Sequence, residues 1–227
     1  MERTAAVEGP ADGRAQPGDR PGGAIDVEHL RRDFGDRVAL ADLSFRVAPG
    51  ESLAVLGPNG SGKSTLLRIL AGLLRPSGGR VAVLGSSLPK ETYQLRGRVG
   101  YLGHEPLLYR DLTPRENLSL AASLNGIDEP EAEQRIGRLL DAVGMSLRAG
   151  DRVAELSAGM RQRIDICRAV LHEPELLLLD EPDAHLDPEA RELVAPLIAA
   201  GGTRSRVLVS HDREAAAQSA DSVLELG

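Results

Sequence analysis

The segment Gly57-Pro58-Asn59-Gly60-Ser61-Gly62-Lys63-Ser64 carries the strongest indication of the fold. It matches the pattern G-x-x-x-x-G-K-[ST] at every defined position. A short apolar run at residues 52–56 precedes it, and residues 64–74 follow with the pattern of a helix. Glycines let the backbone wrap closely around phosphate oxygens, and the N–H groups at the start of a helix supply positive potential. A chance glycine-rich turn would lack this strand-and-helix context, so the sequence predicts a phosphate-binding loop.

Two side chains of this loop have chemistry suited to a nucleotide. Lys63 is placed to reach the β- and γ-phosphates, and the Ser64 hydroxyl is placed to ligate Mg²⁺. The chain has 25 Arg and only two Lys, Lys63 and Lys90, which indicates that lysine is required at position 63. The residues expected to bind ATP through this loop are Gly57, Pro58, Asn59, Gly60, Ser61, Gly62, Lys63, Ser64 and Thr65.

Composition restricts the class of protein. The chain has 227 residues, which fits one domain, and its 41 % hydrophobic and 2 % aromatic content predicts an aliphatic core. A net charge of −7 and the scarcity of aromatic rings argue against nucleic acid as a partner, because phosphate neutralisation needs clustered cations and base stacking needs aromatics. The single cysteine, Cys167, excludes an intrachain disulfide and a Cys-based metal site, and we interpret it as a buried apolar residue.

The chain is expected to be soluble. No apolar run approaches the roughly 18–20 residues that span a bilayer, and the N-terminus lacks the apolar core of a signal peptide. Residues 1–23 are rich in Gly, Pro, Ala and charge, which predicts a disordered tail before an ordered domain at 24–227. A helical subdomain is expected at about residues 104–165, where a Thr113–Glu116 capping box and helix patterns from Pro130 and Ser157 occur. Further strands are expected near residues 25–27, 40–47, 80–84, 176–179 and 206–209, with a helix between the last two.

A second acidic motif follows an apolar run. Leu176-Leu177-Leu178-Leu179-Asp180 reads as a buried strand that ends in a carboxylate. In enzymes with a phosphate loop, such an Asp holds Mg²⁺, usually through water. Glu181 comes next and can polarise the attacking water. An acid after a strand is common by itself, and its pairing with the phosphate loop gives it significance.

Between these motifs stands Leu156-Ser157-Ala158-Gly159-Met160, followed by Arg161-Gln162-Arg163, which resembles the signature motif of ABC ATPases. Ser157 suits the N-cap of a helix whose free N–H groups could face an anion, although a plain N-cap would look the same. The resemblance extends over about residues 25–226. It implies that Ser157, Gly159 and Asp187 bind ATP, that His211 is the switch histidine, and that Phe34 stacks on adenine. The alternatives are a core position for Phe34 and an ordinary strand-end histidine for His211.

A narrower resemblance concerns the cargo. Tyr101-Leu102-Gly103-His104, with Leu112-Thr113 and Glu116-Asn117-Leu118, is similar to the ATPase of haem exporters for cytochrome c maturation. His104 stands where most ABC ATPases have a glutamine that contacts the Mg²⁺ and water side of the site and leans toward the membrane subunit. Met160 replaces the usual signature glutamine. His104 is therefore expected at the ATP site, and the alternative is a loop histidine with no role.

The resemblance implies an α/β fold: a P-loop NTPase core of ABC type with an antiparallel β subdomain and a helical insert. It implies a homodimer or heterodimer of ATPase subunits, peripheral at the cytoplasmic face of the cell membrane, that works through a separate integral membrane permease. ATP and Mg²⁺ are the expected cofactors. Ser64 and Asp180 are the expected metal ligands, and Lys63, Glu181 and His211 the catalytic residues. Haem export is the favoured function. Alternatives are a drug or lipid exporter, a non-transport ABC ATPase, or a different P-loop enzyme such as a kinase.

Overall fold

The computed structural model describes residues 7–8 and 23–227. The chain divides into two compact units. The first unit contains the described residues up to Arg96, together with Leu178–Asp180 and Ala200–Gly227. The second contains Gly97–Leu177 and Glu181–Ala199. Among the described residues, no helix has the length and apolar character needed to cross a membrane.

The first unit holds an antiparallel sheet. Its strands lie in the order β3-β2-β5-β6. They span Ile25–Phe34 (β2), Arg37–Val47 (β3), Gly78–Val83 (β5) and Ser86–Leu88 (β6), and a 3₁₀ turn follows at Thr92–Leu95. β2 and β3 form a hairpin through Gly35, whose φ of 58° favours glycine, and Phe34 pairs directly with Arg37.

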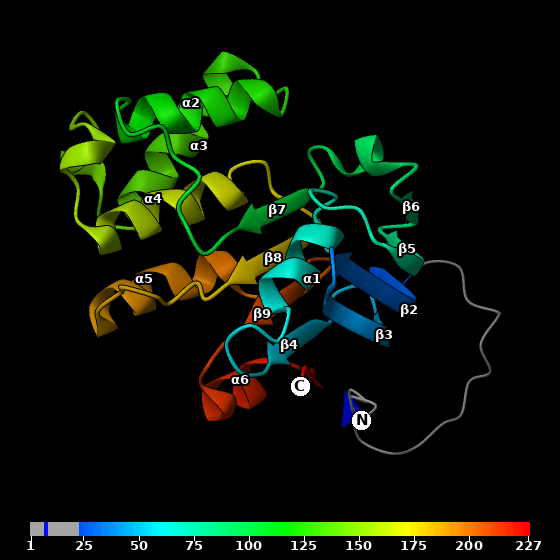
Figure 1. The fold of residues 1–227 in the computed structure, drawn as a ribbon. Coiled ribbons are helices and arrows are strands. Elements are labelled where there is room, and N and C mark those ends of the chain that lie inside the picture. The colour runs from blue at the N-terminus through cyan, green and yellow to red at the C-terminus, as the bar shows by residue number, and fades with distance from the viewer. Residues whose placement is uncertain (1–6, 9–22) are drawn as a thin grey trace. The chain divides into compact units, whose positions relative to one another are not determined.

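A second sheet carries the phosphate loop (Figure 1). Its strands in the first unit are Val7–Glu8 (β1), Ser222–Glu225 (β10), Ser52–Leu56 (β4) and Ser205–Val209 (β9), in that spatial order, with helices Lys63–Leu70 (α1) and Arg213–Ser219 (α6). β4 is parallel to both β10 and β9. All five residues of β4 and of β9 are buried, as expected of parallel strands covered on both faces.

The second unit is mainly helical. It contains strand Val99–Leu102 (β7), the first two residues of Leu176–Asp180 (β8), and helices Pro114–Leu124 (α2), Glu129–Ala142 (α3), Ala158–Val170 (α4) and Pro188–Ile198 (α5), with short 3₁₀ turns at Ser146–Arg148 and Val153–Glu155. The capping box that begins α2 is present: Glu116 N donates to Thr113 Oγ1 at 3.2 Å, and Thr113 N donates to Glu116 Oε2 at 2.8 Å.

Most of the expected elements form, and the structure adds several. The helix expected at 64–74 is shorter: it ends at Leu70 with Ala71 as its C-cap, and the chain leaves helical geometry at Gly72, whose φ is 71°. The short strands β6, β7 and β10 and the helix α6 had no strong periodic signal. Within the expected tail, Val7 and Glu8 pair with β10 as β1, because an edge strand offers unpaired backbone groups. The rest of the tail up to residue 22 lies outside the described residues.

The second compact unit can be compared with the helical subdomain predicted from the sequence. The predicted helical subdomain at about 104–165 falls inside the second unit, which begins at Gly97 and also includes β7 and α5. Its exact limits, like those of the 24–227 domain, stay predictions.

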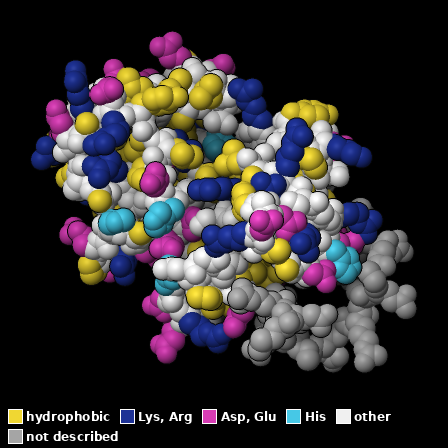
Figure 2. All heavy atoms as spheres, in the orientation of Figure 1, with side chains coloured by type: hydrophobic (Ala, Val, Ile, Leu, Met, Phe, Trp, Pro, Cys, Tyr) yellow, Lys and Arg dark blue, Asp and Glu magenta, His cyan; other side chains and the backbone are white. Residues whose placement is uncertain are grey.

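On the face shown in Figure 2, cationic and acidic side chains are intermingled.

A close backbone approach in the second unit yields a stability prediction. A Cβ on Gly100 would lie 2.2 Å from the Ala169 carbonyl oxygen, so Gly100→Ala should destabilise the protein by about 2 kcal/mol or more. Gly137, inside α3, has nothing within 4 Å of its Cβ position, so Gly137→Ala should raise stability by about 0.5–1 kcal/mol through helix propensity. Urea unfolding of both variants checks this, and similar effects of the two would contradict it.

Candidate nucleotide-binding site

The phosphate loop joins β4 to α1 through three glycines with positive φ. The angles are 149° at Gly57, 82° at Gly60 and 100° at Gly62, which is the N-cap of α1. At Gly57 a Cβ would lie 2.3 Å from the Leu226 carbonyl oxygen. The loop therefore needs glycine at Gly57 for both its torsion angle and its contact with the backbone after β10.

Lys63 is the first residue of α1, and its side chain folds back into the phosphate loop. Its side chain is buried, at 7 % exposure, and its Nζ donates to the carbonyl oxygens of Gly57 at 2.7 Å and Pro58 at 2.9 Å. Backbone carbonyls carry only partial charge, so the ammonium keeps most of its capacity to attract an anion. The structure thus holds a positive charge at the loop without a carboxylate to neutralise it among the described residues.

Two further predicted site residues of the first unit lie at or just after the carboxyl ends of neighbouring strands. Asp180 is the last residue of β8, which neighbours β9, and His211 follows β9 after Ser210. Because β4 and β9 are parallel, the phosphate loop and His211 leave the sheet at the same edge. Asp180 is 2 % exposed, and its Oδ2 has no hydrogen-bond partner in the described part of the chain. A buried carboxylate oxygen with an unfilled acceptor position fits an expected hydrated Mg²⁺.

Phe34 lies at the tip of the β2–β3 hairpin. Its side chain is 46 % exposed, which excludes the alternative that it is a core residue. The guanidinium carbon of Arg32 lies 4.4 Å from the ring centroid, in cation–π geometry, and Arg32 Nη1 also donates to the Arg75 carbonyl at 3.1 Å. The guanidinium therefore lies over one face of the ring, and its hydrogen bond to Arg75 holds the guanidinium in place.

In the second unit, α4 begins within the signature segment (residues 156–160). Ser157 Oγ accepts a hydrogen bond from Met160 N at 3.2 Å, which confirms the predicted N-cap. A Cβ on Gly159 would lie 2.6 Å from the His185 carbonyl oxygen, so only glycine permits this approach. Gln162 is buried and its Nε2 donates to the Pro182 carbonyl at 3.1 Å. Both contacts join the start of α4 to the turn that follows β8.

That turn carries Glu181 and leads to Asp187. Glu181 is half-buried and has a φ of 53°, an uncommon conformation for a residue with a side chain. Its carbonyl accepts from Ala184 N at 3.0 Å. Asp187 is the N-cap of α5, where Oδ1 accepts from Ala190 N at 2.8 Å, so the structure gives this residue a capping role in addition to its predicted one.

His104 is exposed and lies just after β7, in a segment anchored by a buried ion pair that the sequence interpretation missed. The pair is Asp165 and Arg168 of α4, with Arg168 Nε donating to Asp165 Oδ1 at 2.6 Å. Arg168 Nη2 also donates to the Tyr101 carbonyl at 2.7 Å. The only signal in the sequence was an aspartate among the apolar residues of segment 163–170, RIDICRAV. The periodicity of a helix does not by itself predict that this aspartate is buried and paired.

Burial governs the chemistry of α4. It raises the pKa of Asp165, whose side chain is 0 % exposed, while Arg168 and the Leu107 backbone N–H act in the opposite direction. Burial also raises the pKa of the neighbouring Cys167 to about 12, so this thiol is inert at neutral pH, in agreement with its interpretation as a core residue.

The predicted site residues thus fall into two groups. The first unit brings together the phosphate loop, Asp180, His211 and Phe34. The second carries His104, Ser157, Gly159, Glu181 and Asp187. A glycine-rich loop between a buried parallel strand and a helix, with a lysine inside it and an aspartate ending a nearby strand, defines a nucleotide-binding protein of the P-loop class.

Comparisons with known proteins identify the family. The family model described as "ABC transporter" matches residues 40–184, and the chain belongs to that family. A solved structure described as the ATP binding subunit of an ABC transporter superposes with a TM-score of 0.81 at 32 % identity, over 89 % of this chain and 85 % of that chain. The expected fold, a P-loop NTPase core of ABC type, and the expected class of enzyme, an ABC-type ATPase domain, are confirmed.

Two curated relatives give a finer comparison. Nod factor export ATP-binding protein I of Rhizobium meliloti (strain 1021) is 38 % identical over 219 residues, which covers 94 % of this chain and 65 % of that protein. A daunorubicin resistance ATP-binding protein of Streptomyces coeruleorubidus is 39 % identical over 208 residues, which covers 90 % of this chain and 66 % of that protein. The chain therefore spans about two thirds of the length of these relatives.

The buried pair in α4 leads to a second stability prediction. Asp165→Ala leaves the guanidinium of Arg168, only 19 % exposed, without its carboxylate, and should lower the free energy of unfolding by about 3 kcal/mol. The exposed Arg115–Glu133 pair is the control, and Glu133→Ala should cost less than about 1 kcal/mol. Denaturant unfolding measures both. Equal, small losses would show that the α4 pair contributes no more than a surface pair.

Proposed function

We propose that this chain is the ATP-hydrolysing subunit of an ABC exporter and that it works through a separate integral membrane subunit at the cytoplasmic face of the cell membrane. The observation that carries the proposal is the phosphate loop with its buried, carbonyl-bound Lys63, at the sheet edge where His211 also emerges. Family membership supports it, as do the descriptions of the two relatives, Nod factor export for one and daunorubicin resistance for the other.

The first unit supplies the groups that would hold the nucleotide. The loop N–H groups and the start of α1 bind the phosphate chain, and Lys63 exchanges its carbonyl partners for the β- and γ-phosphate oxygens. Phe34 offers its exposed ring to adenine. Mg²⁺ would be held by the Ser64 hydroxyl and, through water, by Asp180, and it would neutralise charge on the phosphoryl group.

Glu181 and His211 are the residues proposed to act on the reaction itself. Glu181 directly follows Asp180, and its carboxylate would orient and polarise the attacking water. Its positive φ is a backbone strain of the kind that persists where the surrounding structure fixes a residue for function. His211 would contact the γ-phosphate side of the nucleotide, and Lys63 would stabilise the charge that develops on the transferred group.

The proposed working form is a dimer, either of two copies or of this chain with a similar one. In a head-to-tail arrangement, the phosphate loop of one subunit faces the signature segment (residues 156–160) of the other, so that ATP bridges the two. The capped start of α4 presents backbone N–H groups suited to the γ-phosphate. Asp187 and His104 are assigned to the periphery of the same site. Hydrolysis removes the bridge and so converts chemistry into motion.

For the cargo, we propose an organic compound of the drug or lipid type. The curated relatives carry the descriptions Nod factor export and daunorubicin resistance. These descriptions favour the alternative of a drug or lipid exporter over haem export. The haem-exporter resemblance depended mainly on Tyr101–His104, a four-residue stretch whose histidine is an exposed loop residue. We therefore keep export as the function and withdraw haem as the favoured substrate.

Substitution of Glu181 tests the enzymatic role. Glu181→Gln keeps the size of the side chain and removes its basic oxygen, so we expect ATP hydrolysis to fall by about a hundredfold or more while ATP binding persists. With the bridge no longer cut, Mg-ATP should also drive this variant into a dimer. Steady-state phosphate release and gel filtration with Mg-ATP measure the two effects.

Lys63→Ala is the matched control for this experiment. It removes the cation of the loop and should abolish ATP binding, and with it both hydrolysis and ATP-dependent dimerisation. Hydrolysis by Glu181→Gln near the parent rate, or a variant that stays monomeric with bound ATP, would contradict the role assigned to Glu181.

A further inference from the structure

Arg37, the first residue of β3, reaches the phosphate loop. Its Nη2 donates to the Gly60 carbonyl at 3.4 Å, and a Cβ on Gly60 would lie 3.4 Å from the same nitrogen. Two residues further along β3, the Ala39 carbonyl oxygen lies 2.5 Å from the Cβ position of Gly62. The start of β3 therefore runs alongside the loop at two successive points, and Arg37 lies over its middle.

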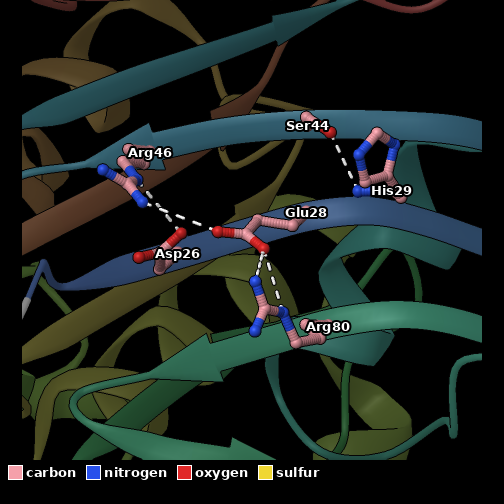
Figure 3. A network of polar contacts seen from close by, with 6 residues as sticks. All are labelled: Asp26, Glu28, His29, Ser44, Arg46 and Arg80. Carbon is pink, nitrogen blue, oxygen red and sulfur yellow. Dashed lines mark hydrogen bonds and ion pairs between the residues drawn. The ribbon is translucent and has the colours of Figure 1, made fainter. Parts of the chain in front are cut away.

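The charge of Arg37 is not neutralised within the described part of the chain. Three other arginines of this sheet, Arg31, Arg46 and Arg80, have carboxylate partners, and Figure 3 shows those of Arg46 and Arg80. Arg46 Nε, for example, lies 3.1 Å from Asp26 Oδ1. Arg37 by contrast is exposed and makes one long hydrogen bond to a carbonyl. Since a guanidinium has five N–H donors, most of its capacity is open to another acceptor.

The hairpin places this guanidinium beside the ring proposed to stack on adenine. Phe34 and Arg37 are direct cross-strand partners, and such partners lie on the same face of an antiparallel pair. Because the Arg37 side chain reaches Gly60, that face is the one next to the phosphate loop. The face therefore carries an exposed aromatic ring and an unneutralised cation, next to a loop built for phosphates.

We propose that Arg37 is a second cationic contact to the phosphate chain of a bound nucleotide, in addition to Lys63. Its position opposite Phe34, at the base-binding side of the loop, assigns it to the inner α- and β-phosphates. A guanidinium suits this role because its planar donors can bind two phosphate oxygens at once. The inference rests on the proposed function, since it requires that the loop bind a nucleoside triphosphate or diphosphate.

The test measures the affinity of the full chain for Mg-ADP and for a non-hydrolysable Mg-ATP analogue. We expect Arg37→Ala to weaken both by about tenfold, which is 1.4 kcal/mol, because an inner-phosphate contact is common to the two ligands. Arg37→Lys should recover part of the affinity. Arg46→Ala is the matched control, as it removes the same charge from the same strand and should change affinity less than about twofold. Melting temperatures confirm that the variants are folded.

The outcomes separate the two levels of the proposal. A parent chain that binds neither ligand overturns the proposed function and this inference with it. A parent that binds both, with Arg37→Ala binding equally well, overturns the inference alone. Equal weakening by Arg37→Ala and Arg46→Ala would reduce the effect to net charge, and loss confined to the ATP analogue would place the contact at the γ-phosphate. Either result also overturns the assignment.

Discussion

The parallel pairing of β4 with β9 and β10 is the constraint on which the candidate site depends. It aligns Val55 with Val209 and with Leu224, so that these strands end at one edge of the sheet. The chain leaving β4 must then turn directly against the backbone after β10. The 2.3 Å between the Leu226 carbonyl oxygen and a Cβ built on Gly57 shows how little space remains. The phosphate loop takes its shape from this crowding as much as from its own glycines.

The loop and its surroundings hold polar groups whose capacity is only partly used. The ammonium of Lys63 has two carbonyl partners, the guanidinium of Arg37 has one, and Asp180 Oδ2 has none in the described residues. Lys63 and Asp180 are buried, and unfilled acceptors and charges lower stability when they are buried, so proteins retain them where a ligand completes them. This pattern connects the fold to the proposed binding of a nucleotide with its metal ion.

The second unit relies on a different kind of interaction. Its segments are joined by close backbone approaches at Gly100 and Gly159 and by the buried Asp165–Arg168 pair, which also binds the Tyr101 carbonyl. Such contacts have strict geometric requirements. A clash with a backbone oxygen, or the loss of a partner for a buried charge, cannot be relieved by small side-chain movements. The segment that carries His104 is thereby tied to the same helix that begins with the signature Ser157.

Local sequence motifs were sufficient to predict the class of the protein. The motifs at residues 57–64, at residues 156–160 and at Asp180-Glu181 depend on local chemistry, and their order along the chain was enough to predict the P-loop core. The N-cap at Ser157 and the capping box at Thr113 were predicted in the same way, each from its own neighbouring residues. The contacts between residues far apart in the sequence became visible only in the folded chain. The Arg37–Gly60 contact, the exposed ring of Phe34, the buried Asp165–Arg168 pair and the short strands β6, β7 and β10 have weak local signals. They arise because strand pairing and packing bring together residues whose separation in the sequence conceals the contact.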